Sequence, residues 1–406
     1  MTKLNEKAIN LHKKLKGKLE VKSRIKVNDS EVLSLVYSPG VADVCEIIKQ
    51  NPKATFEYTN RWNNIAIISD GSAVLGLGNI GPEAALPVME GKAILFKQFG
   101  NIDAFPLCIS TQEPEKIIEF VEMLSPTFGG INLEDISSPR CFRIESELKE
   151  KLNIPIFHDD QDGTAIVVLA ALRNALKVIG KKIEDVRFAI VGIGAAGGAI
   201  IKLLIKAGAK NIIACDKKGI LNLNKPETLL NDFHREIIKL INPENIVGSL
   251  TDAIKGADVF IGTSVGGIVN GEMIKKMARD PIVFALANPI PEISPEEAKK
   301  FGAKIVATGR SDYPNQVNNL LVFPGIFRGT LDVRTDKITE EMKFAAVNAI
   351  SECVSELEMS DKFIVPKIFD KRVTQNVAIE VARAAISCGV AKVNIREAER
   401  RILSNL

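Results

Sequence analysis

Two pairs of adjacent acidic residues follow short apolar runs in the first half of the chain. Glu134 and Asp135 end the segment that begins at residue 128, and Asp159 and Asp160 follow the run 155–158. If both runs are parallel strands, their carboxyl ends meet at one edge of a sheet, where the sites of α/β proteins lie. Crowded carboxylates repel one another unless a cation holds them, and oxygen ligands favour Mg²⁺ or Mn²⁺. The alternative is a set of solvated turn acids and helix caps.

Two other side chains stand out by their surroundings. Lys92 lies in a mostly apolar, helix-like stretch, where a lysine either extends its ammonium group to water or is held in a polar site. The first arrangement is the commoner one. Tyr37 directly precedes a Ser-Pro-Gly turn, and considered alone it is better explained as a ring that packs at a strand end.

The segment 186–216 contains a GxGxxG motif between two expected strands. An apolar run, 188–191, leads into the glycines at 192, 194 and 197, a helix follows as far as Gly208, and a second strand, 211–215, ends in Asp216. These glycines allow a tight turn, close approach of a pyrophosphate and close helix–strand packing, while the helix N-terminus favours phosphate. The pattern predicts a dinucleotide site. A second GxGxxG, which begins at Gly76, is followed directly by Pro82, and we interpret it as a turn.

The elements that position these residues predict an α/β protein of two domains. Short apolar strands recur between residues 188 and 307, which indicates a doubly wound Rossmann sheet. A strong helix over 165–178 leads into it. We therefore predict an N-terminal α/β catalytic domain over 1–160 and a C-terminal dinucleotide-binding domain over 161–406, with terminal helices at 337–354 and 374–387.

Composition excludes several classes of protein. The 406 residues are 46% hydrophobic and 25% charged, with a net charge of +3, which argues against nucleic acid and anionic membranes as partners. The six cysteines are scattered without a CxxC pair, as in a reduced, cytoplasmic protein. No run approaches the roughly 18 apolar residues of a spanning helix. The sequence has only three histidines, at positions 12, 158 and 234, which argues against a metal site built from three histidines.

Taken together, these stretches resemble the malic enzymes, of the shorter kind found in bacteria and archaea. The resemblance extends from about Leu35 to about Val390. The motifs that carry it are YSPGVA (37–42), SDGSAVLGLGNIG (69–81), EGKAILFK (90–97), NLEDI (132–136), HDDQDGTA (158–165), GIGAAG (192–197), ALANP (285–289) and NQVNNLLVFPG (315–325).

The resemblance implies oxidative decarboxylation of (S)-malate to pyruvate and CO₂, with reduction of NAD⁺ or NADP⁺ and a requirement for Mg²⁺ or Mn²⁺. It implies Tyr37 as general acid and Lys92 as general base, the latter with a lowered pKa. The remaining implied roles are metal ligands (Glu134, Asp135, Asp160), cofactor contacts (Gly192, Gly194, Ala195, Ala196, Gly197, Asp216, Asn288) and substrate contacts (Asn288, Asn318, Asn319). The amides taken alone are equally suited to capping loops.

Three expectations remain open at this point. Asp216 favours NAD, but Lys217 and Lys218 follow it and offset the repulsion of a 2′-phosphate. Longer malic enzymes carry a carboxylate-binding arginine near the position of Ala73. The resemblance also implies a homodimer or higher homo-oligomer, with the lysine-rich N-terminal helix as an interface. The alternative functions are a malolactic or non-decarboxylating malate enzyme and a catalytically silent nucleotide-binding regulator.

Overall fold

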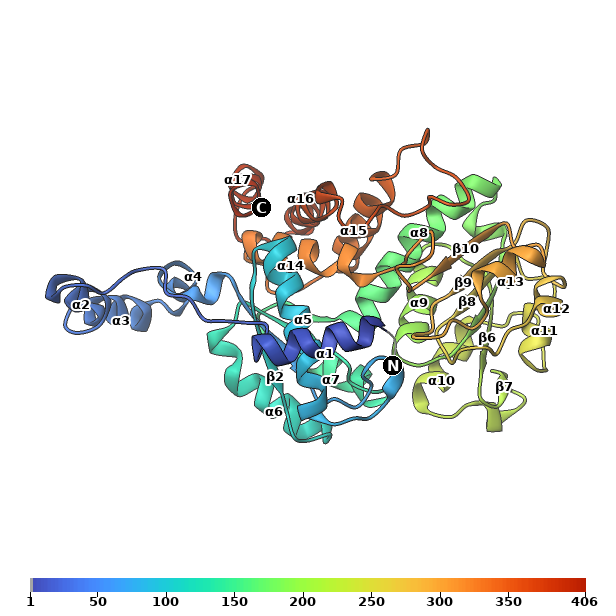
Figure 1. Ribbon diagram of the computed structural model, residues 1–406, viewed down its shortest axis with the longest axis horizontal. Coiled ribbons are helices and arrows are strands. Elements are labelled where there is room, and N and C mark those ends of the chain that lie inside the picture. The colour runs from blue at the N-terminus through green and yellow to red at the C-terminus, as the bar shows by residue number, and fades with distance from the viewer. Residues whose placement is uncertain (1–2) are drawn as a thin grey trace.

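The computed structural model describes residues 3–406 and contains two separate, mostly parallel sheets (Figure 1). The first has the strand order β2-β1-β3-β4. Residues of β1 are all buried and alternate between two cores, one formed with α5 and one with α6 and α7. A strand covered on both faces needs apolar residues throughout, which explains the unbroken run. The elements are β1 (Asn64–Ser69), β2 (Asp103–Cys108), β3 (Gly130–Leu133), β4 (Ile156–His158), α5 (Pro82–Gly100), α6 (Pro114–Leu124) and α7 (Arg140–Lys151).

The second sheet has the order β10-β9-β8-β5-β6-β7, and only β7 runs antiparallel to its neighbour. From β5 the chain adds strands first on one side, as β6 and β7, and then on the other side, as β8, β9 and β10. This order confirms the predicted doubly wound fold. The elements are β5 (Arg187–Val191), β6 (Asn211–Asp216), β7 (Gly219–Ile220), β8 (Val259–Gly262), β9 (Ile282–Ala285), β10 (Ile305–Thr308), α8 (Thr164–Ile179), α9 (Ala195–Lys206), α10 (Asp232–Ile237), α11 (Leu250–Ile254), α12 (Gly271–Ile274) and α13 (Pro295–Lys300).

Four helices follow the second sheet, and the first of them packs against the first sheet's helix α5. Arg328 on this helix is fully buried and donates to Asn63 Oδ1 at 2.7 Å. The predicted boundary at residue 160 stays a prediction. The four helices after the second sheet are α14 (Phe323–Val333), α15 (Glu340–Glu352), α16 (Lys371–Ser387) and α17 (Ile395–Asn405). Within residues 3–406, no helix combines the length and apolar character that crossing a membrane requires.

The N-terminal segment forms an arm that projects away from both sheets (Figure 1). It contains α2 (Ser30–Val36) and α3 (Val41–Gln50), and no residue of either helix is buried. The lysine-rich helix α1 (Lys3–Leu15) precedes the arm and α4 (Thr55–Tyr58) follows it. Tyr37 is the C-cap of α2 and is 71% exposed, so the interpretation of Tyr37 as a ring packed at a strand end is wrong.

Candidate active site

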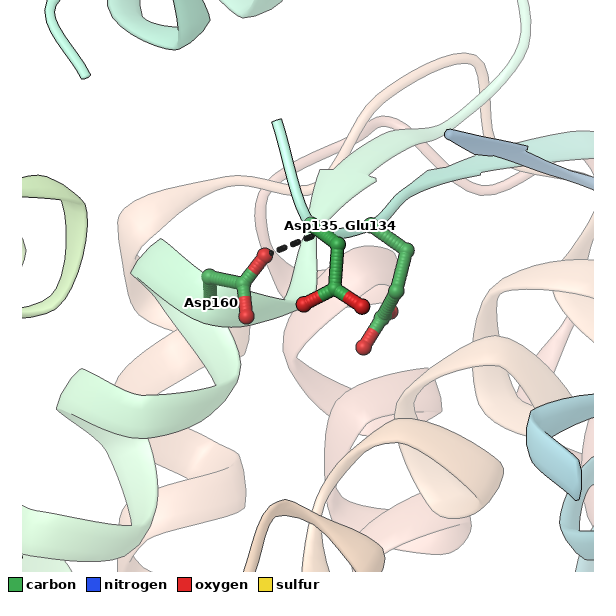
Figure 2. A group of neighbouring side chains, drawn as sticks. All are labelled: Glu134, Asp135 and Asp160. Atoms are coloured by element: carbon green, nitrogen blue, oxygen red, sulfur yellow. Dashed lines mark hydrogen bonds between the residues drawn. The ribbon is translucent and has the colours of Figure 1, made fainter. Parts of the chain in front are cut away.

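The two acidic pairs meet at the carboxyl edge of the first sheet. Strands β3 and β4 are parallel neighbours that pair Leu133 with His158, so the residues after them are adjacent. One carboxylate oxygen from each of Glu134, Asp135 and Asp160 lies within 4.8 Å of the other two. Figure 2 shows the three side chains converging, with the amide of Asp135 donating to Asp160 Oδ2 at 2.8 Å.

Glu134 and Asp135 are buried, which excludes the alternative of solvated turn acids for this pair. Burial, reinforced by the like charges of the other carboxylates, raises the pKa of Glu134 to about 8 and that of Asp135 to about 9. Burial acts in the same direction on Asp160, but the hydrogen bond and charge of His158, the amide of Asp135 and the charge of Lys92 together outweigh it and lower that pKa. Three carboxylates this close together repel one another when ionised, and a hard divalent cation relieves that repulsion.

Lys92 lies beside these acids. Its side chain is 9% exposed, and its Nζ lies 3.1 Å from Glu134 Oε2 and pairs with Asp159 Oδ2. The same nitrogen lies 3.8 Å above the ring of Phe323. The ammonium group is therefore held in a polar site, and the alternative in which it extends to water is wrong.

The carboxylates around Lys92 act on its pKa. Burial acts to lower it, but the charges of Asp159 and Glu134 outweigh burial and raise this pKa above its ordinary value. The expected lowering depended on a nearby divalent cation as well as on burial, so it stays a prediction. A cation bound to the carboxylates would offset their charge and act in the opposite direction.

Asp159 is a site residue that the sequence placed among the clustered acids without a role of its own. It is 1% exposed, and besides Lys92 it accepts from Asn319 Nδ2 at 3.0 Å. Its position directly before Asp160 was the available signal. Asn319 also donates to Thr164 Oγ1 at 3.1 Å, so its amide nitrogen links Asp159 to the first residue of α8.

The other expected substrate amides occupy different surroundings. Asn318 accepts from the amide of Leu320 at 2.9 Å and so caps a short turn. Asn288 follows β9 and is exposed. A Cβ at Gly76 would approach the carbonyl oxygen of Asn288 to 2.3 Å, so the turn at Leu75–Leu77 abuts the loop after β9. The substrate roles of Asn288 and Asn318 stay predictions.

The glycine motif after β5 has the geometry that a dinucleotide needs. Gly192 has φ +87°, and a Cβ at Gly197 would approach the carbonyl oxygen of Gly192 to 2.1 Å, so both positions exclude a side chain. Gly194 faces open space, and α9 begins directly after it without a side-chain cap. The free N–H groups and the open side fit a pyrophosphate. Asp216 ends β6, and Lys217 and Lys218 after it are exposed.

The segment around Ala73 has an arginine beside it from another element. The amide of Ala73 donates to the carbonyl oxygen of Asp135 at 3.0 Å, which places this segment next to the acids. Arg140, the first residue of α7, pairs with the buried Asp70 at 3.1 Å. By contrast, Tyr37 on the projecting arm is not brought to Lys92 within one chain (Figure 1).

Comparison with known proteins finds two matching family descriptions and several similar sequences. The sequence matches the family descriptions "Malic enzyme, N-terminal domain" over residues 16–149 and "Malic enzyme, NAD binding domain" over residues 161–386. It is 55% identical to a bifunctional malic/malolactic enzyme of Bacillus subtilis (97% of this chain, 95% of the relative) and 55% identical to an NAD-dependent malic enzyme of Geobacillus stearothermophilus (93% and 78%). An NADP-dependent malic enzyme of Escherichia coli is 46% identical, and the match covers 96% of this chain and 53% of the relative.

Solved structures show the same similarity. The NAD-dependent malic enzyme from Thermotoga maritima superposes with a TM-score of 0.90 at 56% identity, covering 92% of this chain and 98% of the other. The malic enzyme from Pyrococcus horikoshii superposes with a TM-score of 0.94 at 49% identity, covering 99% and 95%.

Proposed function

The chain belongs to the malic enzyme family, and we propose on that basis that it converts (S)-malate to pyruvate and CO₂ with reduction of NAD⁺ or NADP⁺. The observation that carries the proposal is the meeting of Lys92 with the cluster of Glu134, Asp135 and Asp160. A proton acceptor beside a hard-cation site is what oxidation of a 2-hydroxy acid requires.

We propose that Glu134, Asp135 and Asp160 hold Mg²⁺ or Mn²⁺. When bound, the cation supplies Lewis acidity towards the malate oxygens and the nicotinamide supplies the hydride acceptor. Lys92 Nζ takes the proton of the C2 hydroxyl, and the cation's charge favours the neutral amine that this step needs. Asp159 orients that nitrogen by pairing with it, and Asn319 fixes the Asp159 carboxylate.

Tyr37 is proposed to protonate C3 as pyruvate forms, and a second copy of the chain is proposed to supply it. The arm that carries Tyr37 exposes the apolar side chains of Leu33, Leu35 and Val36, which a monomer leaves in water. A groove of about 1020 Å³ lies at the root of the arm, lined in part by residues 19–24 and 57–60. An exposed apolar arm and a nearby groove support a homo-oligomer in which arms are exchanged.

We propose NAD as the preferred cofactor because Asp216 ends β6, where a carboxylate binds the ribose 2′-hydroxyl and repels a 2′-phosphate. Both cofactors occur in the names of similar proteins. We also infer a cytoplasmic location, since the six cysteines are all free.

A malolactic activity is the second candidate function. It is favoured by one observation, the name of the Bacillus subtilis relative, which is a bifunctional malic/malolactic enzyme. The two activities differ in products, because the malic reaction yields pyruvate with reduced cofactor and the malolactic reaction yields lactate without net reduction. The silent-regulator alternative predicts neither product.

Lys92→Ala tests the proposed base, with Lys116→Ala as its matched control. The side chain of Lys116 is 60% exposed and pairs with Glu113, the residue that precedes α6. Loss of a general base costs typically 10²–10⁴-fold, so Lys92→Ala is expected to lose malate oxidation on that scale while Lys116→Ala retains it. Retention of activity by Lys92→Ala would contradict the role.

A further inference from the structure

A buried histidine lies behind the carboxyl end of β6. His234 on helix α10 is 1% exposed, and its Nδ1 accepts a hydrogen bond from the amide of Leu230 at 3.3 Å. Because Nδ1 is an acceptor, the ring proton is on Nε2. Nε2 donates to the carbonyl oxygen of Ile193 at 3.1 Å. Ile193 is the residue between the first two glycines of the dinucleotide motif.

The same nitrogen faces the acidic residue of the cofactor site. Nε2 lies 3.5 Å from Oδ2 of Asp216, and the other oxygen of that carboxylate accepts from the amide of Lys217 at 2.7 Å. The Asp216 carboxylate is therefore flanked on both sides. His234 connects the two elements that a dinucleotide contacts, the glycine turn and the end of β6.

The ring itself has little freedom to move. The side chain of Asn231 accepts from the amide of His234 at 2.9 Å. The neighbouring Phe233 stacks on Phe142 with a centroid distance of 4.2 Å, and a Cβ at Gly198 would approach the Phe233 ring to 2.5 Å. Helix α10 thus packs directly on the first turns of α9 and fixes the histidine relative to the glycine turn.

We propose that His234 is a positioning residue that sets the preference for NAD over NADP by holding the Asp216 carboxylate against the glycine turn. In this orientation the carboxylate accepts a hydrogen bond from a ribose 2′-hydroxyl and repels a 2′-phosphate. Without the ring, the carboxylate turns towards solvent and both effects weaken. The inference rests on the proposed NAD(P)-dependent function and adds a second residue to its cofactor choice.

The test measures dissociation constants of NADH and NADPH from nucleotide fluorescence, without malate or metal. His234→Ala is expected to weaken NADH binding by about tenfold, because the Asp216 carboxylate loses the Nε2 that faces it at 3.5 Å, and to change NADPH binding by less than about threefold. His234→Gln places an amide N–H near the position of Nε2 and is expected to restore most of the preference. Arg235→Ala removes an exposed neighbour of His234 that pairs with Asp232 at the surface, so NADH binding should stay at the wild-type value.

A double variant separates positioning from a general structural effect. If His234 acts through Asp216, then His234→Ala combined with Asp216→Ala should show no greater change in the NADH to NADPH ratio than Asp216→Ala alone. Equal weakening of both nucleotides in the two His234 variants, or an additive double variant, would overturn the inference. Because nucleotide binding is measured directly, failure of malate turnover would overturn the proposed function and not this result.

Discussion

The ammonium nitrogen of Lys92 lies 3.1 Å from Oε2 of Glu134. The contact joins the middle of α5 to the residue after β3, so the proposed base and a proposed metal ligand share one site. Forty-two positions separate the two residues in the chain, and only the folded first sheet brings them together. The predictions below test the proposed roles of Lys92 and of the acidic residues beside it.

Removal of one carboxylate should weaken the binding of the cation. Asp135→Asn replaces a charged oxygen donor with a neutral one while keeping the side chain's shape, so the Mn²⁺ concentration for half-maximal activity should rise by about tenfold or more. Glu113→Gln on the surface is the control. Full turnover in excess chelator would contradict a metal requirement altogether.

Metal binding should release protons at neutral pH. The pKa values of about 8 for Glu134 and about 9 for Asp135 lie above their ordinary values of 4.5 and 3.8. Both acids hold protons that a bound cation must displace, so Mn²⁺ affinity should rise with pH up to about 9. Calorimetry in two buffers of different ionisation enthalpy gives the proton count at pH 7, and a count of zero would show that both acids are already ionised.

The same shifts affect the stability of the metal-free protein. Between the ordinary values near pH 4 and the folded values near pH 8–9, the folded state binds more protons than the unfolded state. The free energy of unfolding should therefore fall as pH rises through this window, and added Mn²⁺ should remove part of the fall. Urea titrations at several pH values measure both effects, and a rise without metal would be the opposite of the expected sign.

Mixing two inactive variants tests whether Tyr37 acts in a second copy. Tyr37→Phe and Lys92→Ala each impair their own proposed step. If an exchanged dimer forms, random mixing pairs half of the chains as heterodimers, each with one intact site, and about a quarter of the wild-type activity should return. A mixture that stays as inactive as its components after subunit exchange would place both residues in one chain's site.

Much of the fold was predictable because buried parallel strands are continuously apolar and end in recognisable residues. The strand, glycine turn, helix and strand over 187–216 and the acids after β3 and β4 follow this rule. The ion pair between Lys92 and Asp159 was not predictable, since it joins elements that only tertiary packing brings together. That missed pair also explains why the protein's own groups raise the pKa of Lys92.

Two helical segments escaped prediction for different reasons. Helix α14 contains a proline and two glycines, yet it forms because all of its residues are buried, and packing outweighs its poor helix propensity. The arm helices α2 and α3 expose apolar side chains, and none of their residues is buried. A helix without a buried face does not give the usual periodicity of apolar residues.

Arg328 should be important for stability without touching the site. It is fully buried and binds both carboxylate oxygens of Asp332, at 2.8 and 2.6 Å. Arg328→Met leaves that carboxylate buried without its cation, which should lower the free energy of unfolding by about 3–5 kcal/mol. Arg235→Met, at an exposed pair with Asp232, is the control and should leave the urea midpoint unchanged. Equal effects of the two substitutions would contradict the role of burial.

The most direct measurement is a product balance with malate, Mn²⁺ and NAD⁺, repeated with NADP⁺. The account predicts that pyruvate, CO₂ and reduced cofactor appear in equal amounts, that NAD⁺ gives the higher kcat/KM, and that omission of Mn²⁺ in the presence of chelator stops all three products. Lactate without net cofactor reduction would identify a malolactic enzyme, and oxaloacetate without CO₂ a simple dehydrogenase. Either of these results, or no turnover at all, would contradict the proposed function.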